Sequence, residues 1–201
     1  MNPTRRFLAL LPLAALIAVA GCQKYAAAEV RRGIDLPASL WIKPTGAVPM
    51  PIPDFDFLAG TWDVANRRLR ARHCGSDDWD TFPGRSIVRP HLQGMANVDE
   101  IAFPTKGWSG LTIRLFDVEA RRWGIWWVNS RDGRLQAPVF GAFSGEVGEF
   151  FGEDLDEGRP VRVRYRWTRT GSDTPRWEQA FSPDDGLTWE TNWVMDLQRV
   201  G

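Results

Sequence analysis

The segment Val161-Arg162-Val163-Arg164-Tyr165-Arg166-Trp167 decides the fold class, because its apolar and basic residues alternate strictly. Successive side chains of a β-strand point to opposite faces, so this alternation predicts a strand with one apolar face and one solvated face. Such a strand must border an apolar interior on one side and water on the other.

Similar β-type runs, separated by Gly, Asp and Pro, fill the chain from Phe55 onward, where helical periodicity is nearly absent. We expect strands near 61–72, 84–91, 95–103, 110–117, 122–130, 138–146, 148–153, 160–169, 175–182 and 188–199. About ten consecutive antiparallel strands with short turns favour an all-β fold, a closed up-and-down barrel, since closure removes exposed strand edges. A two-sheet sandwich is the alternative, and the lack of a repeat of roughly 20–50 residues argues against a propeller.

Apolar residues at every second position predict which side chains meet in the barrel interior. Besides the odd positions of 161–167, the rows are Leu111, Ile113 and Leu115; Trp123, Ile125 and Trp127; and Trp189, Trp193, Met195 and Leu197.

Polar residues inside such rows are candidate site residues, because a buried polar group must be hydrogen-bonded or paired. They are Glu100 in the row 96–102, Gln179 between Trp177 and Phe181, and Thr191 between Trp189 and Trp193. If strand 61–72 keeps its register after Trp62, Asn66 and Arg68 also face inward and Arg68 could neutralise Glu100. The favoured interpretation is that a bulge turns Arg68 to solvent and that Glu100 lies at a barrel rim.

The stretch Phe57-Leu58-Ala59-Gly60-Thr61-Trp62 resembles the Gly-x-Trp signature that opens the first strand of lipocalins, fatty-acid-binding proteins and other calycins. In those barrels a basic residue near the end of the last strand packs across the signature Trp, a role that the resemblance assigns to Arg199. The chain from Phe55 to Arg199, including Asn97-Val98-Asp99-Glu100 and Thr188-Trp189-Glu190-Thr191-Asn192-Trp193, is similar to an uncharacterised lipocalin-like bacterial family. The resemblance implies a calycin-type barrel over 55–201 and no particular activity.

Residues 1–21 have the form of a signal peptide, with Arg5 and Arg6 ahead of an apolar run from Phe7 to Ala20. That run is shorter than the roughly 20 residues of a membrane-spanning helix. It ends in Val19-Ala20-Gly21-Cys22, which is typical of lipoproteins whose cysteine accepts a diacylglycerol and becomes the N-terminus. Gln23 in the next position favours the outer membrane, facing the periplasm, as the address.

Residues 22–54 contain five prolines from Pro37 to Pro53 and no sustained period, so we interpret them as a lipid-anchored tether. A flexible tether of this length has a reach on the order of 30 Å. Removing the signal leaves 23 basic against 25 acidic residues, and this balance offers no basic field for nucleic acid. With Cys22 acylated, Cys74 is the one remaining thiol, and 11 Trp and 11 Phe supply the core instead of a disulfide.

Two further motifs are interpreted as turns. Ser182-Pro183-Asp184-Asp185-Gly186-Leu187-Thr188-Trp189 matches the Asp-box of sialidases, but a single copy indicates a hairpin turn. The acidic cluster Glu153, Asp154, Asp156 and Glu157 lacks calcium-loop spacing and is expected to be a solvated hairpin tip. His73, Cys74 and His91 are too few for a zinc site, and neither histidine lies in an apolar row as a haem ligand should, so no metal or cofactor is expected.

Three functions remain open. The first is a non-catalytic module that binds a small, largely apolar ligand between Trp127, Tyr165, Trp177 and Trp193, oriented by Glu100, Gln179 and Thr191. The second is an acid–base isomerase or cyclase that uses a buried Glu100. The third is an envelope interaction or assembly protein whose barrel is packed solid. Fold alone does not decide among them, and the first is the favoured interpretation.

Overall fold

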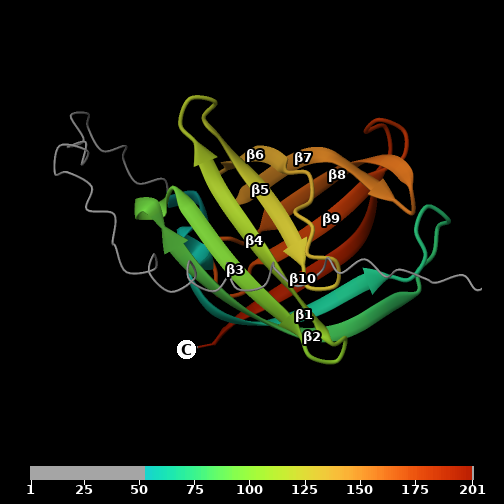
Figure 1. Ribbon diagram of the computed structural model, residues 1–201, viewed down its shortest axis with the longest axis horizontal. Helices are drawn as coiled ribbons and strands as arrows, with labels where there is room; N and C mark the ends of the chain where they lie inside the picture. Colours follow the sequence, from blue (N-terminus) through green and yellow to red (C-terminus); the bar gives the residue numbers. More distant parts are fainter. Residues whose placement is uncertain (1–52, 201) are drawn as a thin grey trace, which may run out of the picture. The chain divides into compact units, whose positions relative to one another are not determined.

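The computed structural model describes residues 53–200, and they form a closed barrel of ten antiparallel strands. Each strand pairs with the next along the chain, and β10 pairs with β1 to close the ring (Figure 1). The strands are β1 Gly60–Leu69, β2 Trp79–His91, β3 Ala96–Phe103, β4 Trp108–Asp117, β5 Arg122–Asn129, β6 Val139–Ser144, β7 Val147–Asp156, β8 Arg159–Thr168, β9 Arg176–Ser182 and β10 Glu190–Val200. The closed ten-strand barrel predicted from the sequence is confirmed, and the sandwich alternative is wrong.

The largest boundary difference concerns β2, which begins at Trp79 rather than near residue 84. Pro83 lies inside this strand, and a proline lacks the N–H that a central strand donates to its neighbour. The strand tolerates Pro83 opposite Ala65, where its ring is exposed on the outer surface. The strand therefore begins several residues before the start expected from the sequence.

Aromatic and branched side chains of the inner face form one continuous core. The predicted row Val161, Val163, Tyr165 and Trp167 faces inward, while Arg162, Arg164 and Arg166 lie on the outer face. The row Trp123, Ile125 and Trp127 also faces inward as predicted. The barrel interior thus follows directly from alternation in these two strands.

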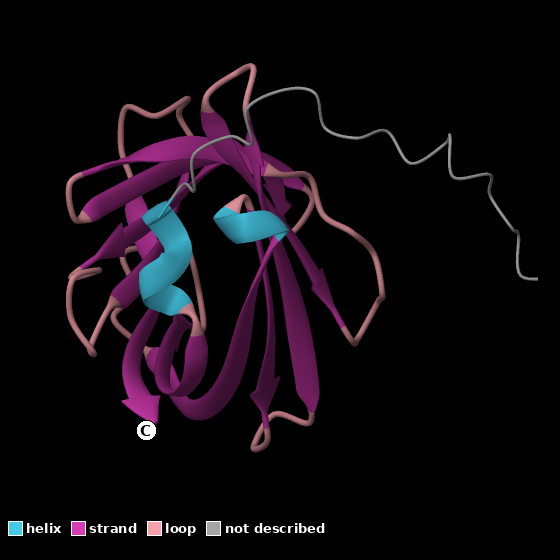
Figure 2. Ribbon diagram, turned by 90° about the vertical axis from the view of Figure 1, so that its left-hand side faces the viewer, coloured by secondary structure: helices cyan, strands magenta, loops and turns pink. Residues whose placement is uncertain are grey.

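Two short 3₁₀ helices, η2 (Pro53–Leu58) and η3 (Leu92–Gly94), lie at one end of the barrel, in front of the strands in Figure 2. Phe55 of η2 is 2% exposed and its ring meets Trp123 edge-on, with ring centroids 4.8 Å apart. The preceding residue, Asp54, accepts a hydrogen bond of 3.0 Å from the Trp123 indole. Helix η2 therefore fills this end of the barrel, which we call the closed end.

Trp62 and Arg199 hold the closed end together. They are direct partners across the β1–β10 pairing, and the Arg199 guanidinium lies 4.2 Å from the centroid of the Trp62 ring. Arg199 also donates to the carbonyls of Phe57 (2.6 Å) and Ala59 (2.7 Å), while the indole of Trp62 donates to that of Leu58. Gly60 has φ of +126°, and a Cβ there would lie 2.8 Å from the Arg199 guanidinium. The predicted contact between the signature tryptophan and the terminal arginine is confirmed.

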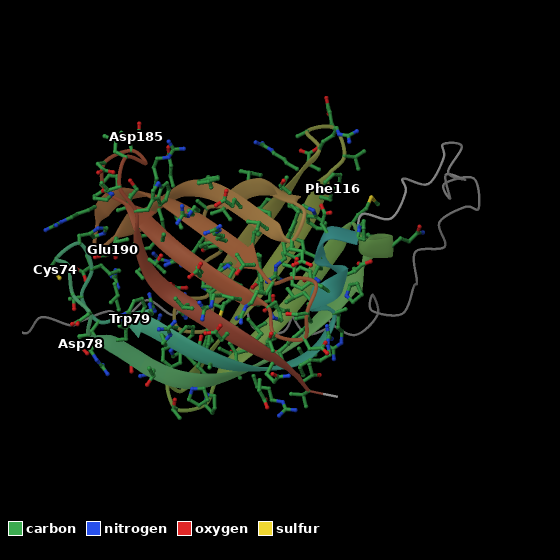
Figure 3. The ribbon with its side chains drawn as sticks, turned by 180° about the vertical axis from the view of Figure 1, so that it is seen from behind. Cys74, Asp78, Trp79, Phe116, Asp185 and Glu190 are labelled. Atoms are coloured by element: carbon green, nitrogen blue, oxygen red, sulfur yellow. The ribbon has the colours of Figure 1, made fainter. Side chains whose placement is uncertain are left out.

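The opposite end carries the loops 70–78 and 183–189, marked in Figure 3 by Cys74 and Asp185, whereas Phe116 marks the closed end. In loop 183–189, Asp184 accepts hydrogen bonds from the Thr188 amide (2.8 Å) and hydroxyl (2.6 Å), which lower its pKa to about 2. The indole of Trp189 donates to the carbonyl of Gly186, whose φ is +93°. The Asp-box segment is therefore a hairpin turn, as predicted, at what we call the open end.

Candidate ligand-binding site

The barrel encloses a cavity of about 300 Å³ that extends from Leu58 at the closed end to Arg72 at the open end. This volume lies at the lower limit of the roughly 300–1,000 Å³ found for small-molecule pockets. Its walls include the four aromatic residues singled out from the sequence, Trp127, Tyr165, Trp177 and Trp193. The structure thus brings together residues from four different strands, β5, β8, β9 and β10.

Trp193 is the centre of this aromatic wall. Its ring meets Trp177 and Trp127 edge-on, with centroids 5.6 and 6.4 Å away, and Trp177 in turn meets Tyr165 at 4.9 Å. The Trp193 indole donates a hydrogen bond of 3.1 Å to the buried side chain of Asn66. The contacts with neighbouring rings and the indole hydrogen bond together fix the orientation of the Trp193 ring.

A glycine makes room for Trp127. A Cβ at Gly110 would lie 1.8 Å from the end of the Trp127 ring, so the indole rests directly on the backbone of β4. Only glycine permits this approach without displacing the ring. Gly110 therefore sets the position of one cavity wall.

The prediction that Leu111, Ile113 and Leu115 face inward is wrong. Directly paired residues of neighbouring strands share a face, and Trp127 pairs with Thr112 rather than with any residue of this row, which we call the leucine row. Once Trp127 points inward, Thr112 and Arg114 must do so too, and both are buried. The leucine row consequently lies on the outer surface, where Leu115 is 39% exposed.

The same register overturns the placement of Glu100. Glu100 pairs with Leu111, so it lies on the outer face and is exposed, while Asp99, Ile101 and Phe103 are buried. Each parity of β3 contains one carboxylate, but the apolar residues Ile101 and Phe103 are larger than Ala96, Val98 and Ala102 and bury more surface. Glu100 can neither orient a ligand in the cavity nor act on one there.

Thr191 and Trp189 are also placed outward, because a bulge interrupts β10. The register against β9 shifts between Thr191 and Trp193, which leaves Asn192 as the extra residue. Trp189 packs on the outer surface against Phe151, at 6.0 Å between ring centroids, and under Arg164. Gln179 faces inward as predicted and donates a hydrogen bond of 2.8 Å to the buried Asn192.

A buried ion pair that the sequence interpretation missed lies on the cavity wall. Arg114 of β4 donates to Asp99 of β3 and, at 2.8 Å, to Asn97, and the side chains of Arg114 and Asp99 are each 7% exposed. The Arg114 guanidinium also lies 5.3 Å from the centroid of the Phe55 ring. The signal was an arginine and an aspartate at diagonal positions of adjacent strands, since Asp99 pairs with Thr112 and Arg114 with Asn97. Assigning the opposite face to each strand concealed it.

Arg68 points into the cavity, so the favoured interpretation that a bulge turns it to solvent is wrong. β1 pairs without interruption with both neighbours from Thr61 to Arg68, and the Arg68 guanidinium lies 4.8 Å from the centroid of the Trp193 ring. Burial lowers the pKa of Arg68, and the positive charges of Arg72 and Arg131 lower it further. The expected partner Glu100 is on the other side of the sheet.

The loop 70–78 reaches across the open end to β7. Arg72 donates two hydrogen bonds from Nε to the carboxylate of Asp156, at 2.8 and 2.9 Å, and the amide of His73 donates to Glu190 of β10 at 2.8 Å. Burial by itself would raise the pKa of Asp156, but hydrogen bonds and charge from Arg72 outweigh it and the pKa falls. The loop thus ties β7 and β10 together at the cavity mouth.

The acidic cluster of β7 is not the solvated tip that was expected. Asp156 is 7% exposed, and Asp154 also lines the cavity, where burial raises its pKa. Only Glu153 and Glu157 match the expectation, since both are exposed.

Several expectations concern residues or groups outside this site. Cys22 and the predicted tether up to residue 52 lie outside the described residues, whereas Pro53 and Asp54, also predicted as tether, belong to η2. Between residues 53 and 200, no helix is long and apolar enough to cross a membrane. In the same range no three or more His, Cys, Asp or Glu side chains are grouped as metal ligands. Comparison of the sequence with protein-family models gives no match, and comparison with curated proteins gives none either.

Proposed function

We propose that this protein is a non-catalytic binding module whose barrel holds a small, largely apolar ligand, and that an acylated Cys22 tethers it to the bacterial envelope. The observation that carries the first part is the cavity of about 300 Å³ walled by Trp127, Tyr165, Trp177 and Trp193. A rigid aromatic wall costs little conformational entropy when a ligand binds, because its side chains are already ordered.

The competing interpretations have less support. A barrel packed solid would leave no such space in its interior, and the exposed Glu100 lacks the buried position that an acid–base role in the cavity requires. The proposed envelope address rests on the signal-peptide and lipoprotein pattern in residues 1–23.

N-phenyl-1-naphthylamine, an uncharged fluorescent aromatic amine, tests the cavity. Residues 23–201, made without the lipid, should bind it saturably at one site, with energy transfer from tryptophan to the probe. Thr112→Phe should abolish this binding because Thr112 lines the cavity and is 7% exposed.

Thr61→Phe is the matched control, because Thr61 lies on the outer face of β1 and does not line the cavity. Unchanged affinity in Thr112→Phe, with the fold intact by circular dichroism, would contradict an interior site. If the site is confirmed, mass spectrometry of compounds that co-purify with the protein would identify the natural ligand.

A further inference from the structure

The cavity contains a guanidinium without a counter-charge. Arg72 pairs with Asp156 and Arg114 pairs with Asp99, but Arg68 makes no ion pair or side-chain hydrogen bond with any residue from 53 to 200. Arg68 instead lies over the ring of Trp193, the centre of the aromatic wall. Since a guanidinium stays protonated in proteins, this side chain presents a positive charge to the cavity.

The neighbouring charges do not cancel that of Arg68. Arg131 is exposed at the cavity mouth, lies 4.4 Å from the Trp108 ring centroid, and makes no ion pair within the described range. Burial lowers the pKa of Arg68, the positive charges of Arg72 and Arg131 lower it further, and the negative charge of Asp156 acts in the opposite direction. Of the four arginines that line the cavity, Arg68 and Arg131 therefore have no ion-pair partner among residues 53–200, whereas Arg72 and Arg114 do.

The acidic residues at the mouth are largely engaged elsewhere. Asp156 binds Arg72, Glu157 lies 3.5 Å from the same arginine, and Glu190 accepts the amide of His73. Asp154 also lines the cavity, where burial raises its pKa, and its carboxylate accepts a hydrogen bond of 2.7 Å from the Leu155 amide. Desolvated charge without a partner is unfavourable, so an anion that entered beside Arg68 would be stabilised.

We infer that the ligand is an amphipathic anion whose oxyanion, such as a carboxylate, binds Arg68 while its apolar body packs against Trp127, Trp177 and Trp193. A guanidinium suits this task because its donors match the two oxygens of a carboxylate. The inference rests on the proposed function and names the ligand class of the same cavity.

Two probes of similar size separate charge from hydrophobicity. 8-Anilinonaphthalene-1-sulfonate carries a sulfonate, and N-phenyl-1-naphthylamine is the same ring system without it. In residues 23–201, Arg68→Met should weaken binding of the sulfonate probe by about tenfold or more, as expected for a lost charge-assisted hydrogen bond, and change binding of the neutral probe less than about twofold. Arg89→Met is the control, because Arg89 is exposed on the outer face of β2 and should leave both affinities unchanged.

Arg68→Lys covers the case in which Arg68→Met unfolds. Lysine keeps the charge but lacks the two-pronged donor geometry, so binding of the sulfonate probe should fall by about threefold while the neutral probe binds as before. An unchanged ratio of the two affinities in the folded Arg68 variants would overturn the anion inference and leave the binding function standing. Failure of the unsubstituted protein to bind either probe would overturn the proposed function itself.

Discussion

The contact between Trp62 and Arg199 predicts a measurable coupling between the first and last strands of the barrel. Trp62 is fully buried, with 0% exposure, and its replacement by Ala removes a large side chain from a well-packed end. Such truncations cost about 3–5 kcal/mol of the free energy of unfolding. The lost indole hydrogen bond to Leu58 places the cost toward the upper part of that range.

Arg199→Met removes two charge-assisted hydrogen bonds, to Phe57 and Ala59, and the ring contact at 4.2 Å. Hydrogen bonds to charged groups contribute about 1.5–3 kcal/mol when buried. The Arg199 side chain is 33% exposed and also binds the exposed Asp173, so solvent reduces these contributions. We expect a total loss of about 2–3 kcal/mol, with most of the side-chain volume retained by methionine.

The assay is a double-mutant cycle with Arg199→Met and Trp62→Leu, measured by urea unfolding and followed by circular dichroism. Leucine keeps the site apolar but removes the aromatic face, so the cycle isolates the contact between the ring and the guanidinium. A partly desolvated cation–π pair predicts a coupling of about 1 kcal/mol. Additive effects, within about 0.3 kcal/mol, would refute the idea that this pair joins the two ends of the chain.

Four further outcomes are expected. Cys22→Ala should abolish labelling by a clickable fatty acid and release the protein from membranes, and persistent labelling would exclude this acylation site. A chain that begins at Asp54 should be folded and water-soluble, since all ten strands pair within it; aggregation in detergent-free buffer would count against this. The folded-state pKa of Asp156 is lowered, so this carboxylate should stabilise the protein relative to Asp156→Asn. The stabilisation should be complete above the ordinary aspartate pKa of about 3.9 and should disappear as the pH falls through the folded-state value. Equal differences in unfolding free energy at neutral pH and at the lowest pH where both proteins fold would contradict the pairing. Gly110→Ala should weaken N-phenyl-1-naphthylamine binding by displacing Trp127, whereas Gly124→Ala, which crowds the outward Trp126, should change stability without changing affinity.

Local sequence determined the architecture of this protein. Strict alternation of apolar and basic residues in 161–167 predicted a strand with one buried face, and ten β-type runs joined by short connections were enough to predict a closed barrel. Trp62 and Arg199 were also predicted as partners from the resemblance to calycins, and up-and-down closure places the first strand beside the last. The turn at 183–189 depends on contacts between residues a few positions apart, so it too could be identified from the sequence.

Only the tertiary structure decided which side chains of β3 and β4 point into the barrel. β3 and β4 carry polar and apolar residues on both parities, and a shift of one residue exchanges their faces. The pairing of Trp127 with Thr112 settled the choice, and it brought Asp99 and Arg114 inward and Glu100 outward. In β10, the extra residue at the Asn192 bulge shifts the register by one position, and Thr191 therefore points outward instead of inward.

The cavity and its charge are tertiary properties as well. Open space inside a barrel is what remains after side chains from all of its strands have packed, so no single segment encodes it. Whether Arg68 has a partner depends on β7 and loop 70–78, which give Asp156 to Arg72 instead. The sequence could place Arg68 on an inward row. Only the packed barrel determines that Arg68 faces the cavity without a counter-charge, because a counter-charge would have to come from strands far apart in the chain.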